Sequence, residues 1–98
     1  MLDNVAKQWQ LNPECRLYWR CWGSDHILFN AASGQTHLLN TVGVAALRLL
    51  KQKKLTELEL KQRLALELKL TLDDELCAYI KSMLIDMDDL GLIEPCTL

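Results

Sequence analysis

The order of apolar and polar residues changes near Asn40, where short strand-like segments give way to helical periodicity. Before this point, apolar and aromatic residues alternate with polar ones, which is typical of β-strands. Gly34 can adopt a positive φ angle in a tight turn, so the segment after it can pair back on the segment before it. We therefore expect a three-stranded antiparallel sheet, with strands at residues 15–22, 26–30 and 35–39.

The first predicted strand has one core face and one amphipathic face. Its core-facing residues are Cys15, Leu17, Trp19 and Cys21. The opposite face carries Arg16, Tyr18, Arg20 and Trp22.

Two predicted helices follow the sheet. Asn40 or Thr41 caps a helix that runs to about Lys53, because apolar residues recur there at helical spacing. Thr56 and Glu59 then form a capping box that starts the next helix. The buried stripe of this second helix is expected at Leu60, Leu64 and Leu68.

A third helix is predicted from about Leu72 to Leu90, ended by Gly91 in a left-handed C-cap. Leu92 and Ile93 after it are expected to form a brief terminal strand. The core stripe of this helix is predicted at Leu72, Leu76, Ile80, Met83, Met87 and Leu90, with Leu84 at its flank.

Three strands followed by three helices predict a small α+β domain of winged-helix type. Residues 1–14 show no sustained period, so we expect an N-terminal arm in which Trp9 and Leu11 could act as anchors. The single domain is predicted at residues 15–95, with a frayed tail at 96–98.

Composition agrees with one folded domain. The chain has 98 residues, half of them hydrophobic, and a net charge of −2. Residues 51–98 carry ten Asp or Glu against seven Lys or Arg, so the helical half is acidic. No apolar run approaches the ~20 residues that span a bilayer, so we expect no membrane insertion.

The cysteines and histidines give little sign of a metal site. The four cysteines include no Cys-x-x-Cys pair, and the chain has no signal peptide, so we expect reduced thiols in the cytoplasm. A zinc site built from Cys15, Cys21, Cys77 and either His26 or His37 is the alternative. We expect no cofactor.

Two function classes are disfavoured by the motifs and the charge. The chain has no Gly-rich phosphate loop, nucleophile elbow or His-Glu-x-x-His motif, so we expect no enzyme activity. A winged helix-turn-helix DNA-binding regulator is the alternative function, but its reading helix would be repelled by phosphates. That helix and its exit carry Lys81 against Asp73, Asp74, Glu75, Asp86, Asp88, Asp89 and Glu94.

Several motifs, in this order, resemble the PqqD-like peptide chaperones. They are Asn30-x-x-Ser33-Gly34-x-Thr36-His37-Leu38-Leu39-Asn40, then Leu47-Arg48-Leu49-Leu50, Leu55-Thr56-x-x-Glu59-Leu60 and Leu90-Gly91-Leu92-Ile93-Glu94. The first is most similar to the short subgroup associated with HPr-kinase-related proteins. The resemblance implies a RiPP recognition element, a non-catalytic winged-helix-like domain that binds the leader of a ribosomally made precursor peptide.

The resemblance also implies where the leader binds and which proteins take part. The leader adds as a strand beside the third strand, at Gln35, Thr36, His37, Leu38 and Leu39, in a cleft against the third helix. Helix residues facing this cleft are expected to be Tyr79, Met83 and Asp86, or Cys77, Lys81 and Leu84 if the opposite flank faces it.

The expected partners are the precursor peptide and a modifying enzyme, such as a radical-SAM or HPr-kinase-related protein, with no nucleic acid and no membrane. An uncovered sheet edge or a swapped arm could also form a homodimer. His37 could bond a leader side chain, but covering the sheet is the favoured role, since edge-strand recognition uses mainly backbone groups.

Overall fold

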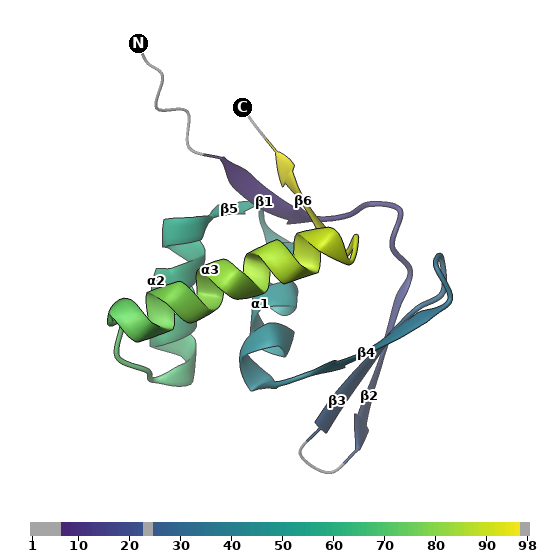
Figure 1. Cartoon of the computed structure of the whole chain (residues 1–98), viewed down its shortest axis with the longest axis horizontal. Coiled ribbons are helices and arrows are strands. Elements are labelled where there is room, and N and C mark those ends of the chain that lie inside the picture. Colours follow the sequence, from purple (N-terminus) through teal and green to yellow (C-terminus); the bar gives the residue numbers. More distant parts are fainter. Residues whose placement is uncertain (1–6, 23–24, 97–98) are drawn as a thin grey trace.

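The computed structural model describes residues 7–22 and 25–96, which fold into three helices and two three-stranded sheets (Figure 1). This confirms the α+β class and the sheet that precedes the helices. The elements are β1 (Gln8–Leu11), β2 (Leu17–Trp22), β3 (Asp25–Asn30), β4 (Gln35–Leu39), α1 (Thr41–Gln52), β5 (Leu55–Thr56), α2 (Glu57–Leu68), α3 (Asp74–Asp89) and β6 (Ile93–Cys96).

The predicted meander is the sheet β2-β3-β4, in which both neighbouring pairs are antiparallel. Its turn contains Gly34 with φ of 77°, as the turn chemistry predicts. Leu28 lies opposite Trp19 on one side and His37 on the other, so these three side chains share the inner face of the sheet. Leu28 is fully buried there, and the predicted core face of β2 is therefore the inner face.

A second sheet, in the order β5-β1-β6, was not predicted. The arm predicted for residues 1–14 is wrong at residues 8–11, which form β1 and pair antiparallel with both neighbours. Trp9 is 5% exposed and belongs to the core, so it anchors β1 as a core residue. Residues 1–6 lie outside the described part of the chain.

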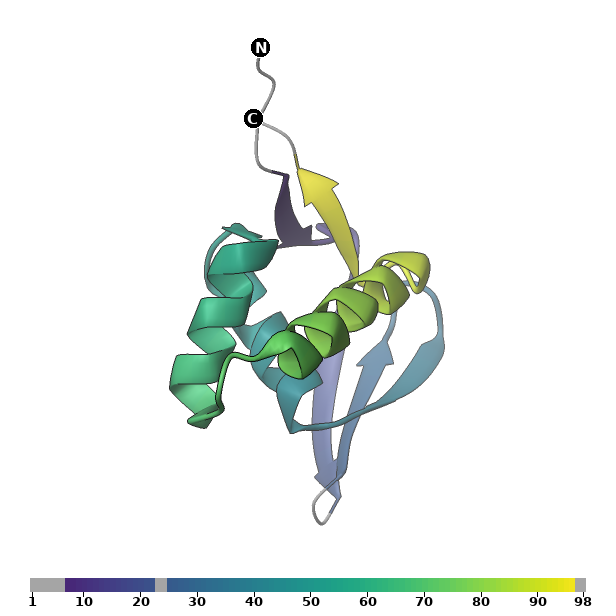
Figure 2. The same cartoon turned by 60° about the vertical axis from the view of Figure 1, so that its left-hand side comes forward.

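The first and last described strands lie side by side (Figure 2). Gln10 Nε2 donates a hydrogen bond to Glu94 Oε2 at 2.6 Å between them. The predicted tail is wrong at Cys96, which pairs with Gln8 in β6, while residues 97–98 are not described. A terminal strand is confirmed as β6, but it begins at Ile93, runs on to Cys96 and does not include Leu92.

The helix caps follow the sequence closely. Asn40 Oδ1 accepts a hydrogen bond from the N–H of Gly43 at 2.8 Å, so Asn40, the first of the two candidates, is the cap of α1. The capping box of α2 forms between Thr56 and Glu59 in both directions. Gly91 after α3 has φ of 76°, as predicted for its left-handed position.

The buried face of α3 is rotated relative to the predicted stripe. Ile80, Leu84 and Met87 are buried, whereas Leu72 and Leu90 are 39% and 43% exposed. Leu72 precedes the helix, which is capped by Asp73, and Leu90 follows its last turn, so neither is held against the core. The core itself joins Leu28 of β3 to α1, α2, α3 and β6.

Asn30 organises the start of β2 and the turn after β3. Its side chain is 4% exposed, and Oδ1 accepts from the N–H of Arg16 at 3.2 Å and of Ala32 at 3.1 Å. Its Nδ2 donates to Cys15 Sγ at 3.5 Å. A buried amide with these partners ties the segment before β2 to the turn after β3.

Cys15 extends this cluster to the end of α3. Its Sγ donates to the Gly91 carbonyl at 3.2 Å, and Asn12 Nδ2 donates to the same carbonyl at 3.1 Å. Burial raises the pKa of the Cys15 thiol, and the hydrogen bond from Asn30 opposes that rise. The thiol is therefore held neutral, as a donor.

No helix in the described ranges is long and apolar enough to cross a membrane.

We expect Asn30→Ala to destabilise the fold by about 1–3 kcal/mol, because it removes the shared acceptor of two part-buried N–H groups. Urea unfolding followed by circular dichroism measures this loss. Gln35→Ala is the matched control, since Gln35 lies opposite Asn30 in the sheet but is exposed. Equal losses for the two variants would contradict the role of Asn30.

The capping box predicts a pH dependence. Hydrogen bonding to the backbone, and then to the side chain, of Thr56 lowers the pKa of Glu59. The stabilisation by Glu59 is therefore present above its ordinary pKa and lost as pH falls through the lowered value. In urea unfolding, the wild-type protein should have a larger free energy of unfolding than Glu59→Gln, and this difference should shrink in acid. Glu67→Gln, in the same helix but outside the box, is the control and should show no such trend. A constant advantage across the acid range would contradict this.

Candidate functional site

The site is built on β4, one of the two edges of the sheet β2-β3-β4. The N–H of Ala31 donates to the Arg16 carbonyl at 2.8 Å, so the backbone groups of Ala31 face β2. Successive residues of an antiparallel strand direct their backbone groups to opposite neighbours. The backbone groups of Asn30 must therefore face β4, and its carbonyl accepts a hydrogen bond from the N–H of Gly34 at 2.8 Å, on that side.

The same alternation decides which groups of β4 are free. Gln35, His37 and Leu39 lie opposite the β3 residues that face β4, so their backbone groups pair inside the sheet. The N–H and C=O groups of Thr36 and Leu38 point away from β3. They form an edge that a further strand can join.

A groove of about 280 Å³ runs beside this edge, between the end of β4, the start of α1 and one face of α3. Its lining is mainly apolar, and Asp86 is the charged residue in it. The lining residues are Leu38, Leu39, Asn40, Gly43, Tyr79, Ser82, Met83, Asp86, Met87 and Leu90.

Gly43 lines the groove at the start of α1. A Cβ atom at this position would lie 3.4 Å from Met87 Cε and 3.5 Å from Leu39 Cδ2. These are ordinary van der Waals distances, so the backbone of α1 lies about one methyl group away from the side chains of β4 and α3.

Tyr79 and Asn40 close one side of the groove. The Asn40 side-chain amide donates a hydrogen bond to the Tyr79 hydroxyl, while Asn40 Oδ1 caps α1. Asn40 thus fixes the end of β4, the start of α1 and the position of an aromatic ring on α3.

A second hollow of about 420 Å³ lies along the first half of α3, and Tyr79 lines both hollows. Asp73 and Glu75 line the second hollow, as Asp86 lines the first. The surface along α3 beside the groove is therefore negative.

The predicted helix residues Tyr79, Met83 and Asp86 are brought together with Leu38 and Leu39 of the predicted strand. The alternative flank does not line this groove. Of its members, Leu84 is 1% exposed in the core, while Cys77 and Lys81 lie outside the groove lining.

Three of the predicted strand residues do not line the groove. Gln35 and Thr36 are exposed farther along β4. His37 lies on the inner face of the sheet opposite Leu28, and its Nε2 is shielded from solvent with no hydrogen-bond partner among the described residues. This position agrees with the favoured role of His37 in covering the sheet.

Ser82, Met87 and Leu90 line the groove but were not predicted to do so. Helical spacing could have found them, because positions three and four residues apart share a face and Met83 and Asp86 were already assigned to it. The contribution of Asn40 and Gly43 could not be read from spacing, since it depends on how α1 meets α3.

The cysteines and histidines do not form a metal centre in the part of the chain that the structure describes, where no group of three His, Cys, Asp or Glu could hold an ion. The zinc ligands considered from the sequence are therefore not assembled. All four cysteines are free thiols.

The chain matches no family model, no curated protein and no solved structure in the three comparisons made.

Proposed function

We propose that this protein is a non-catalytic peptide chaperone that binds an extended segment of a precursor peptide by strand addition to β4. The observation that carries the proposal is the free edge of Thr36 and Leu38 beside an apolar groove. Main-chain hydrogen bonds to such an edge provide affinity, and pockets for alternate side chains provide selectivity.

The groove can accept the side chains on one face of the added strand. Alternate residues of an extended peptide point to opposite faces, so every second side chain can enter the groove. Met83, Met87 and Leu90 offer flexible apolar contacts there. Asp86 and the acids along α3 favour a peptide that also carries Lys or Arg.

The same charge argues against the alternative function of a DNA-binding winged helix. Asp74, Glu75, Asp88 and Asp89 are exposed on α3 together with a single cation, Lys81. Phosphate neutralisation by cations supplies most non-specific DNA affinity, so this surface repels DNA.

The partners follow from the resemblance of the sequence motifs to PqqD-like chaperones. The bound segment is then the leader of a ribosomally made precursor peptide. The protein presents it to a modifying enzyme of the radical-SAM or HPr-kinase-related kind, in the reducing cytoplasm that suits four free thiols.

Amide chemical-shift mapping tests the site. The probe is an acetylated and amidated heptapeptide with a central leucine, a lysine two residues to either side and threonine at the other positions. Added to the ¹⁵N-labelled full chain, it should shift the amides of β4 and the groove face of α3. Shifts confined to α1 and α2 would contradict the proposal.

Leu38→Pro should weaken this binding about two- to twelvefold, because it removes one outward hydrogen-bond donor worth about 0.5–1.5 kcal/mol. The sheet should remain folded, since proline is tolerated at edge positions whose N–H faces solvent. Leu38→Ala is the matched control, as it shortens the side chain but keeps the N–H. Equal weakening by both variants in the titration would exclude a backbone contact at Leu38.

The DNA alternative has its own readout. We expect no gel-shift complex with duplex DNA even at low salt, whereas a salt-dependent complex would overturn the peptide assignment in favour of a regulator.

A further inference from the structure

The opposite edge of the same sheet, β2, also has free backbone groups. The carbonyl of Arg16 accepts from the N–H of Ala31, so it points toward β3. Every second residue of β2 repeats this direction, so the backbone groups of Tyr18 and Arg20 also point toward β3. Leu17, Trp19 and Cys21 then direct their N–H and C=O groups away from the sheet. No strand in the described part of the chain pairs with this edge.

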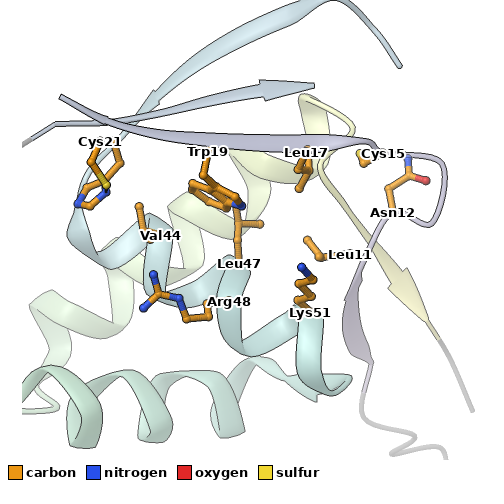
Figure 3. A pocket seen from close by; sticks show the side chains of 11 residues that line it. Leu11, Asn12, Cys15, Leu17, Trp19, Cys21, Val44, Leu47, Arg48 and Lys51 are labelled. Atoms are coloured by element: carbon orange, nitrogen blue, oxygen red, sulfur yellow. Dashed lines mark hydrogen bonds between the residues drawn. The ribbon is translucent and has the colours of Figure 1, made fainter. Parts of the chain in front are cut away.

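The side chains of these edge residues cover a cavity of about 490 Å³ between β2 and α1 (Figure 3). Val44 and Leu47 form the wall on α1, and Figure 3 shows the Trp19 ring directly over Leu47. Trp19 is 39% exposed, so a large aromatic surface is accessible from the cavity mouth. An apolar side chain entering here would bury this ring.

The charges of this cavity are positive, in contrast to the groove at β4. Arg48 and Lys51 both line it and both are exposed on α1, three residues apart on one face of the helix. Among the side chains that the structure describes, neither forms a salt bridge with a carboxylate. The two edges of one sheet therefore present grooves of opposite charge.

We propose that the β2–α1 groove binds an acidic, extended peptide segment of a partner protein, added as a strand beside β2. The backbone of the segment pairs with Leu17, Trp19 and Cys21, and an apolar side chain enters the cavity beside Trp19. Carboxylates two residues to either side of it reach Arg48 and Lys51, where arginine can bind one in bidentate geometry.

The geometry selects this occupant over two others. A small apolar anion would fill the cavity but leave the edge donors and acceptors of β2 unpaired. A second copy of this chain presents eight of its thirteen acids on α2 and α3, which are helices and cannot add to a sheet. An extended acidic segment satisfies the edge, the cavity and the two cations together.

The consequence is a domain that holds two different peptides at once. The segment at β2 does not compete with a ligand at β4 for backbone groups, because β3 lies between the two edge strands. The opposite charges prevent either peptide from taking the site of the other.

A matched pair of peptides tests this assignment by chemical-shift mapping on the ¹⁵N-labelled full chain. The acidic probe is an acetylated and amidated heptapeptide with a central leucine, a glutamate two residues to either side and threonine elsewhere. Its backbone-blocked counterpart has the same sequence with the leucine and both glutamates N-methylated, because these residues direct their N–H groups toward β2 in an antiparallel added strand. The protein variants are Arg48→Glu and, as a charge-matched control outside the cavity, Lys81→Glu.

We expect the acidic probe to shift amides of β2 and of α1 around Leu47, and to bind less tightly as salt is raised. Arg48→Glu should weaken it at least about tenfold, the loss expected when a close charge pair becomes repulsive, while Lys81→Glu leaves it unchanged. The N-methylated probe should not bind.

Three results would overturn the assignment. They are an absence of shifts at millimolar probe, shifts confined to β4 and α3, and equal binding of the N-methylated probe, which would indicate an anion cavity without strand addition. Binding of the lysine-containing peptide at β4 is followed through different amides of the same protein. A failure of the acidic peptide to bind at β2 is therefore distinguished from a failure of the lysine-containing peptide to bind at β4.

Discussion

The hydrogen bonds of Asn30, Cys15 and Asn12 are the constraint on which the arrangement of the two sheets depends. The sheet β2-β3-β4 carries few core residues of its own, since Leu28 is the buried hydrophobic residue among its described side chains. Its position is set by Asn30, which holds the start of β2, and by the carbonyl of Gly91, which Cys15 and Asn12 hold at the end of α3. Without these bonds the meander would be tethered to the helices by Leu28, by the partly buried Leu17 and Leu39, and by the chain itself.

This mode of attachment explains why both sheet edges are free. A meander fixed through a few inner-face side chains and one end of its first strand leaves β4 beside α3 and β2 beside α1, with a hollow at each. The charge of each hollow is then set by the helix that forms its wall. The acidic α3 and the cationic end of α1 give one small domain two chemically different strand-accepting surfaces.

Most local features could be predicted from the sequence because they depend on nearby residues. The cap at Asn40, the box at Thr56 and the left-handed Gly91 each rely on contacts within a few positions. The strand β1 could not, because its four residues gain their partners from β5 and β6, far along the chain. Helical spacing was enough to predict which residues of α3 line the groove. The part played by Asn40 and Gly43 could not be predicted, because it depends on the contact of α1 with α3.

The pairing of β1 with β6 has a consequence for how the chain folds. Gln10 and Glu94 are separated by 84 positions, so this contact closes nearly the whole described chain into one loop. Loops of this length carry a high closure entropy and form late. On the ribosome, β1 can pair with β5 once that strand emerges, but its other edge stays open until β6 follows, so the nascent chain exposes one edge of this sheet late in its synthesis.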